Sequence, residues 1–264
     1  MTLTLETAGY RAPLALRPVD SATGADVGDG LVALAWPEGD PAAARAARRS
    51  RMSALLGFGT LPGLYSQEVA TAAGGAVLDW PALDPRPFIV TVTDTFDRYL
   101  PEVLAVKAPR TAPLDVTLYS APTRPRPPGW ATVYGEVQVS TGGAPAAWAL
   151  VELTGAGTAY QTVSDERGRF LCYLPYPEAL PVLAGSPPVG GGIGDVSWAL
   201  AVTVNFEPAS LAWPVVPGTG PPDIASIRAQ SQAQISEGGN PQASIVATLS
   251  FGTPLLLRLG VVPA

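Results

Sequence analysis

One segment, residues 129–177, constrains the fold more than any other part of the chain. Its sequence, GWATVYGEVQVSTGGAPAAWALVELTGAGTAYQTVSDERGRFLCYLPYP, consists of short apolar and polar runs separated by glycine-containing turns. Alternation with a period of two residues places every second side chain on one face and is typical of β-strands. The segment therefore predicts four short strands of an all-β domain.

A second copy of part of this pattern lies upstream. The nine residues VTDTFDRYL at 92–100 align with VSDERGRFL at 163–171, which gives the shared pattern V-[ST]-D-x-x-[DG]-R-[YF]-L. We expect the aspartate of each copy to accept backbone N–H groups across a tight turn, and the aspartate or glycine three residues later to adopt the left-handed conformation. The predicted structural turn residues are Asp94, Arg98, Asp165, Gly168 and Arg169. The repeat predicts two β-sandwiches in tandem, of the transthyretin or immunoglobulin type.

The length and the composition support this organisation. The 264 residues are enough for two ordinary β-domains, and the 28 glycines and 29 prolines separate apolar runs instead of forming low-complexity tracts. The proline-rich stretch APTRPRPPG at 121–129 is expected to be extended and semi-rigid. We predict a first sandwich at 1–121, a linker at 122–128 and a second sandwich at 129–264.

Residues 40–57 predict a helical insertion in the first domain. Asp40 and Pro41 resemble a helix start, the following AAARAARRSRMSALL is rich in alanine, and Gly57 could end the helix. In a helix, Arg45, Arg48 and Arg49 would share one face. With the nearby Arg51, they are candidates for contact with an acidic surface of a neighbouring subunit; the alternative is a solvated helix face. Neutralising all four is expected to weaken assembly and to leave folding intact.

The composition also bears on the function classes that fit the chain. There is no histidine, which removes the usual general base, the Ser-His-Asp and Cys-His arrangements and the commonest zinc ligand. The net charge of −6 gives no electrostatic footprint for nucleic acid. We expect no enzymatic activity, no cofactor, no metal and no nucleic-acid partner.

The expected location is the cytoplasm. Cys172 is the only cysteine, the N-terminus shows no basic and apolar signal pattern, and the apolar runs are shorter than a membrane span. We therefore expect a soluble protein without membrane contact.

Several other residues allow both a chemical and a structural interpretation. Asp94 and Asp165 could be catalytic acids, but their repetition in matching turns favours a structural role. Asp20, Asp26 and Asp29 could bind calcium, although their spacing departs from the EF-hand pattern.

The glycine-rich stretch 190–194 lacks the residues of a phosphate-binding loop and is expected to be a flexible loop that orders on contact with a partner. The six tryptophans could line a glycan site, but core and rim positions are the commoner use.

The second half resembles the carboxypeptidase regulatory-like domain, a transthyretin-like β-sandwich. The usual pattern of that family is a T-G-x-P turn, an A-x-V strand and then T-D-x-x-G-x-F, with Ser164 here in place of the usual threonine. The matching residues are Thr141, Gly142, Pro145, Ala149, Val151, Asp165, Gly168 and Phe170. The resemblance implies a fold and no peptidase activity.

The whole chain is also similar to two-sandwich proteins found with bacterial contractile injection systems, which are phage-tail-like particles. The resemblance is carried by LPGL at 61–64, VTDTFDRYLP at 92–101, YSAPTRPRPPG at 119–129, SDERGR at 164–169 and LSFGTPLLLR at 249–258. It implies a structural subunit, a cap or collar adaptor or a baseplate accessory. Its implied partners are sheath, tube, cap or baseplate proteins, in rings with copy numbers related to six.

Two function classes fit this sequence. The first is a non-enzymatic assembly subunit of such a particle, retained in the cytoplasm until the particle is released from the cell. The second is a β-sandwich binding module for adhesion or carbohydrate. An enzyme comes last, because Lys107 lacks an S-x-x-K partner and no acid pair stands out.

Overall fold

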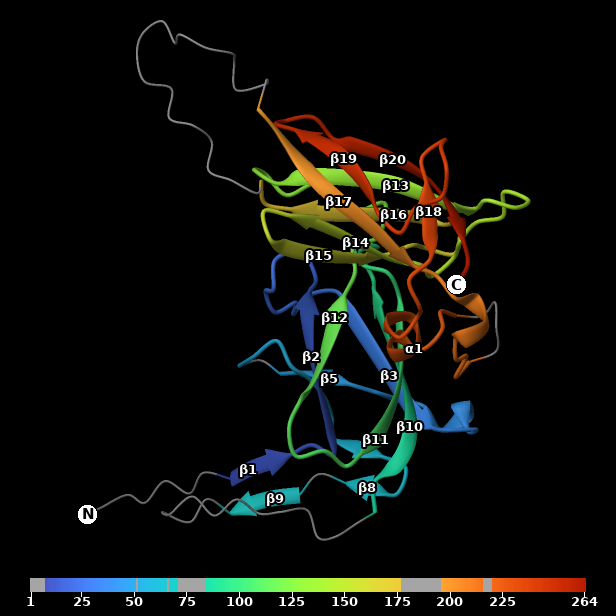
Figure 1. Cartoon of the computed structure of the whole chain (residues 1–264). Helices are drawn as coiled ribbons and strands as arrows, with labels where there is room; N and C mark the ends of the chain where they lie inside the picture. Colours follow the sequence, from blue (N-terminus) through green and yellow to red (C-terminus); the bar gives the residue numbers. More distant parts are fainter. Residues whose placement is uncertain (1–7, 51, 66, 71–83, 177–195, 216–219) are drawn as a thin grey trace, which may run out of the picture. The chain divides into compact units, whose positions relative to one another are not determined.

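The computed structural model describes residues 8–50, 52–65, 67–70, 84–176, 196–215 and 220–264 (Figure 1). Two compact units form, and the first takes Met1–Val19, Ala25–Thr95 and Pro101–Thr117. The second takes Leu118–Ala264 together with two short segments of the first half, Asp20–Gly24 and Phe96–Leu100. The second unit therefore draws on both halves of the sequence.

The first unit contains two four-stranded sheets. One has the order β11-β10-β3-β4, formed by β11 (Glu102–Ala108), β10 (Arg86–Asp94), β3 (Leu31–Pro37) and β4 (Arg45–Ala46). The other has the order β12-β2-β6-β5, formed by β12 (Leu114–Leu118), β2 (Leu14–Asp20), β6 (Leu56–Phe58) and β5 (Arg48–Arg49). Alternate side chains of these strands, such as Leu14, Leu16, Phe58, Phe88 and Val90, are buried and form the core.

Two smaller ladders complete the strands of this unit. The strand β1 (Ala8–Arg11) pairs with β9 (Gln67–Ala70), and β7 (Thr60–Leu61) pairs with β8 (Leu64–Tyr65), both in antiparallel register.

The predicted helix over residues 40–57 is wrong. Pro41–Ala43 forms the single 3₁₀ turn η1, and Asp40 makes no side-chain capping bond. The following residues form β4, which pairs with β3, and then β5, which pairs with β6, so the segment runs from the edge of one sheet to the edge of the other. An isolated helix of this length is marginal, and pairing with a sheet edge outweighs the helix propensity of alanine.

The second unit is also built from two four-stranded sheets. One has the order β16-β13-β20-β18, formed by β16 (Arg169–Leu174), β13 (Ala131–Val139), β20 (Leu255–Val262) and β18 (Gln234–Ser236). The other has the order β15-β14-β17-β19, formed by β15 (Thr158–Val163), β14 (Leu150–Gly155), β17 (Ser197–Asn205) and β19 (Ile245–Ser250). The β13–β20 pair is parallel. Buried residues of both sheets, including Val133, Val151, Phe170, Leu200 and Leu259, form one apolar cluster.

The prediction of an all-β chain with two sandwiches is confirmed. Among the described residues, the only α-helix is α1 (Ile224–Arg228), and a 3₁₀ turn η3 (Pro208–Ser210) precedes it. Within the same residues, no helix has the length and hydropathy needed to cross a membrane.

The proline-rich stretch predicted as a linker is held by hydrogen bonds. The Arg124 guanidinium bonds to Asp20, and Nε of Arg126 donates to the carbonyl of Trp130 at 3.0 Å. The stretch belongs to the second unit. The exact domain boundaries at 121, 122 and 129 stay a prediction.

Candidate functional site

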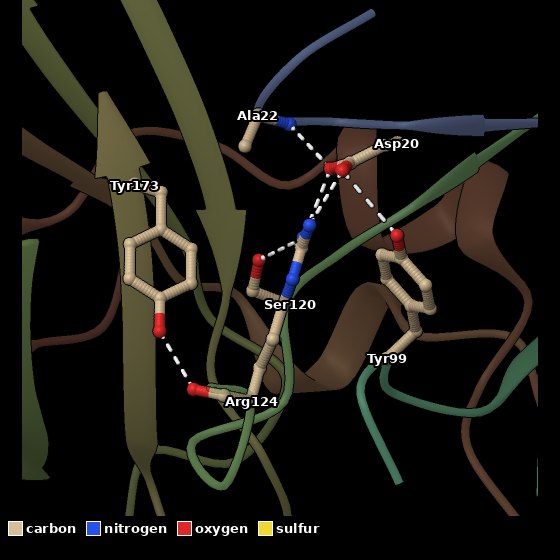
Figure 2. A network of polar contacts seen from close by, with 6 residues as sticks. All are labelled: Asp20, Ala22, Tyr99, Ser120, Arg124 and Tyr173. Carbon is tan, nitrogen blue, oxygen red and sulfur yellow. Dashed lines mark hydrogen bonds and ion pairs between the residues drawn. The ribbon is translucent and has the colours of Figure 1, made fainter. Parts of the chain in front are cut away.

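A buried ion pair in the second unit joins residues that are far apart in the sequence. Asp20 ends β2, and Arg124 lies in the proline-rich stretch (Figure 2). The Arg124 nitrogens donate to the two carboxylate oxygens of Asp20 at 3.0 and 2.6 Å. Their side chains are only 5% and 10% exposed. A pair this deeply buried needs further hydrogen bonds to offset the loss of hydration.

Neighbouring groups supply those bonds. The backbone N–H of Ala22 donates to Asp20 at 2.9 Å, and the Tyr99 hydroxyl donates to the other carboxylate oxygen at 3.3 Å (Figure 2). Arg124 also donates to the Ser120 hydroxyl at 2.9 Å. The network is therefore satisfied on both sides of the ion pair.

Two tyrosine rings enclose the Arg124 side chain. The guanidinium carbon lies 4.7 Å from the centre of the Tyr99 ring and 5.5 Å from that of Tyr173. The Tyr173 hydroxyl donates to the backbone carbonyl of Arg124 at 2.6 Å (Figure 2). Both the side chain and the backbone of Arg124 are thereby fixed.

The protonation states of this network are stable around neutral pH. Burial acts to raise the pKa of Asp20, but the hydrogen bonds from Arg124 and Ala22 outweigh it, so the pKa lies below its usual value. Burial raises the pKa of Tyr99 and of Tyr173 to about 12. None of these groups can exchange a proton readily near pH 7, which fits a structural network better than an acid–base site.

The three aspartates considered for calcium have other contacts. Asp20 is occupied by Arg124, and Asp29 forms an ion pair with Arg49. Asp26 forms an isolated bridge with Val19 through its backbone. Across the described ranges, no group of three or more metal-binding side chains is present.

The Asp165 carboxylate accepts hydrogen bonds from residues of its own turn. One carboxylate oxygen accepts the backbone N–H groups of Arg167 and Arg169 at 2.9 and 2.8 Å. The other accepts two bonds from the Arg169 guanidinium at 3.0 and 2.7 Å. Gly168 has a φ of +75°, and a Cβ there would lie 2.3 Å from the carbonyl oxygen of Val137. Asp165 therefore acts as a turn residue.

The upstream turn has the same backbone feature, a positive φ at the aligned position. Asp97, which aligns with Gly168, has a φ of +54°. The Arg98 guanidinium lies over the rings of Phe96 and Tyr99, at 5.0 and 5.3 Å from their centres. Asp94 is 8% exposed at the end of β10.

The predicted arginine face is not a helix face. Arg45 lies in β4 and donates to the carbonyl of Ala44, whereas Arg48 and Arg49 are adjacent residues of β5. Adjacent strand residues point to opposite sides, and Arg49 is paired with Asp29. All three are exposed, and Arg51 lies outside the described residues.

Two of these arginines line the cavity that we call the arginine trough. It has a volume of about 570 Å³ and is lined by Arg48, Arg49, Arg110 and a set of small or apolar residues, among them Ala12, Ala15, Leu55, Gly57 and Pro113. All of them belong to the first unit. Arg110 follows β11, and its backbone N–H donates to the carbonyl of Pro13 at 2.9 Å. No local pattern in the sequence places Arg110 beside the β5 arginines.

The strand register explains why small residues lie at the base of the trough. Gly57 of β6 lies opposite Ala15 of β2 on one side and opposite Arg48 of β5 on the other. Residues opposite one another in a ladder share a face, and Ala15 lies between the buried Leu14 and Leu16, so this face points away from the core. A Cβ at Gly57 would meet its nearest neighbours at 3.8 and 3.9 Å, which is ordinary contact.

The remaining candidates are the single cysteine, the tryptophans and the glycine-rich stretch. Cys172 is fully buried, which raises the pKa of its thiol to about 12 and makes it a poor nucleophile. Of the six tryptophans, Trp148 and Trp198 are buried, Trp36, Trp130 and Trp213 are half-buried, and Trp80 lies outside the described residues. The glycine-rich stretch 190–194 lies outside the described residues.

No protein-family model matches the chain, and no curated protein matches its sequence. The chain is similar to part of the Bacillus anthracis TIE protein, with 11% identity, a TM-score of 0.27, and coverage of 95% of this chain and 34% of that one, so it spans about a third of that structure. It is similar to a variant of the shaft pilin SpaA of Lactobacillus rhamnosus GG, with 8% identity, a TM-score of 0.24, and 98% and 99% coverage. A putative adhesin from Bacteroides ovatus gives 11% identity, a TM-score of 0.20, and 74% and 73% coverage. Similarities this weak assign neither a family nor a function.

Proposed function

We propose that this chain is a non-enzymatic assembly subunit of a phage-tail-like contractile injection particle, acting as a cap or collar adaptor or as a baseplate accessory. The observation that carries the non-enzymatic part is how two buried carboxylates are bonded. Asp20 and Asp165 are bound by arginine and by backbone N–H groups in closed networks. Each carboxylate is therefore engaged in holding the fold.

The resemblance of five sequence segments to proteins of such particles supports the finer part of the proposal. Proteins that form rings and tubes need rigid domains with defined surfaces, and two sandwiches with satisfied polar networks suit that need. The proposed partners are sheath, tube, cap or baseplate proteins, in rings with copy numbers related to six. The proposed location is the cytoplasm and then the assembled particle.

Native purification tests this proposal. A C-terminally tagged chain would be purified from its host under mild conditions and examined by negative-stain microscopy and mass spectrometry. Co-purification of sheath and tube proteins in constant ratios, together with tail-like particles in the images, is the expected result.

The alternative, a binding module for adhesion or carbohydrate, gives a different result in the same experiment. Recovery of a lone monomer that binds a glycan array would overturn the assembly proposal. Untagged host extract passed over the same resin controls for non-specific recovery of particles.

A further inference from the structure

We propose that the arginine trough is a docking site for an extended acidic segment of a partner protein. The inference rests on the proposed function, because it names the chemistry by which this subunit would hold a neighbour. Its own basis is the combination of unpaired positive charge and an apolar floor.

Two of the three arginines of the trough have no ion-pair partner within the described residues. Within the described residues, Arg49 has an ion-pair partner in Asp29, whereas Arg48 and Arg110 have none. Among the lining residues that the structure describes, none carries a carboxylate. Two guanidinium groups without a partner favour an incoming carboxylate, which matches their planar pair of donors.

The floor of the trough suits a polypeptide better than a single inorganic ion. Ala12, Ala15 and Gly57 leave a low surface between the arginines, with Leu55 and Pro113 as further apolar walls. A volume of about 570 Å³ lies in the range that holds a ligand of many atoms. A main chain with short side chains can rest on this floor while its carboxylates reach Arg48 and Arg110.

The position on the sheet favours an extended occupant. The trough crosses three neighbouring strands, β2, β6 and β5, and β5 is the edge of its sheet. The charged residues at this edge also oppose uncontrolled pairing with other strands. An acidic segment would neutralise that charge and so be selected over neutral strands.

A binding assay tests the proposal with the full chain. The probe is a fluorescein-labelled peptide of alternating alanine and glutamate, and its partner is the same peptide with glutamine in place of glutamate. Fluorescence anisotropy is expected to show binding of the glutamate peptide only, weakening as salt is added. Arg48→Ala with Arg110→Ala should weaken this binding about tenfold, because two exposed charge pairs are lost.

Two further variants make the assay specific for the trough. Gly57→Val adds a side chain to the floor and should weaken binding while both arginines remain. Arg17→Ala is the matched control, because Arg17 is an exposed arginine of the same sheet that pairs with Asp115 and does not line the cavity. It should leave binding unchanged.

Three results would overturn the proposal: equal binding of the glutamine peptide, unchanged binding by the double arginine variant, or displacement of the peptide by an equal concentration of inorganic phosphate. Thermal denaturation confirms that each variant is folded, and the arginine variants suffice if Gly57→Val does not fold. If the peptide does not bind but the particle proteins still co-purify with the chain, only the docking proposal is disproved. If the peptide binds but no particle proteins co-purify, only the proposed role in the particle is disproved.

Discussion

The two copies of the repeated turn share a positive φ at the aligned residues Asp97 and Gly168, but the aromatic residue that follows has different surroundings in each copy. In the second copy, Asp165 bonds to Arg169 four residues away, and the following aromatic residue, Phe170, is buried in the core opposite Gly135. In the first copy, Tyr99 takes the place of Phe170, and its hydroxyl bonds to Asp20, which is 79 residues distant.

One oxygen atom accounts for much of this difference. Phe170 has no polar group and fits against Gly135, where a Cβ would lie 2.2 Å from its ring. Tyr99 carries a hydroxyl that needs a partner when it is buried, and the Asp20–Arg124 pair supplies one. A repeated sequence pattern can thus keep a turn while the contacts of the following aromatic residue change.

The largest effect is expected when one partner is removed from the ion pair that each copy contacts or contains: Asp20–Arg124 beside Tyr99, and Asp165–Arg169. Arg124→Met leaves the buried Asp20 without its counter-ion and should destabilise the protein by about 3–5 kcal/mol. Arg169→Met acts on a guanidinium that is 42% exposed and should cost about 1 kcal/mol or less. Chemical denaturation followed by tryptophan fluorescence measures both. The double variant Asp20→Asn with Arg124→Met should recover part of the loss, and equal losses for the two single variants would contradict the comparison.

The next largest effect on stability is expected at the residues of the two turns that have a positive φ. Gly168→Ala places a Cβ at a positive φ and against the Val137 carbonyl, so a loss of about 2–3 kcal/mol is expected. Asp97→Gly relieves a positive φ and should change stability by less than about 1 kcal/mol. The comparison would be broken if Gly168→Ala were tolerated as well as Asp97→Gly in the same denaturation experiment.

Acid should affect the long-range network. The pKa of Asp20 is lowered in the folded protein, so its contribution to stability is present above its unfolded pKa of about 3.9 and is lost as the pH falls through the folded value. Melting temperatures recorded between neutral pH and pH 3 should fall less steeply for Asp20→Asn than for the unaltered protein. Parallel curves for the two proteins would show that this carboxylate does not couple stability to pH.

The smallest effect on stability is expected at the arginine trough. Arg48→Ala with Arg110→Ala removes exposed side chains that have no ion pair within the described residues, so stability should stay within about 0.5 kcal/mol of the original. Thermal melts of this variant and of Arg17→Ala provide the measurement. A loss as large as that for Arg124→Met would mean that the trough arginines hold the fold.

Local sequence patterns predicted the local parts of this structure. The alternation of residues 129–177 and the turn pattern around Asp165 and Gly168 both describe contacts between residues close in the chain. The Asp20–Arg124 pair joins residues 104 positions apart, and the sequence suggested only a calcium-binding role for Asp20 and none for Arg124. Burial and pairing of this kind depend on the whole fold, which the patterns do not contain.

The arginine segment shows how a local pattern can also mislead. Alanine and arginine are good helix formers, yet this segment forms β4 and β5 because two sheet edges offer it backbone partners. The prediction that Arg48 and Arg49 face a partner stays a prediction, but its geometric basis has changed from a helix face to a trough that includes Arg110.

One measurement tests most directly whether the trough arginines bind a partner without being needed for the fold. Tagged protein would be recovered from its host as the unaltered chain, as Arg48→Ala with Arg110→Ala, and as Arg17→Ala, and the co-purifying sheath and tube proteins would be quantified by mass spectrometry. The proposal predicts that the double variant retains its melting temperature and loses most of these proteins, while Arg17→Ala retains them. Full recovery of the particle proteins by the double variant would contradict it.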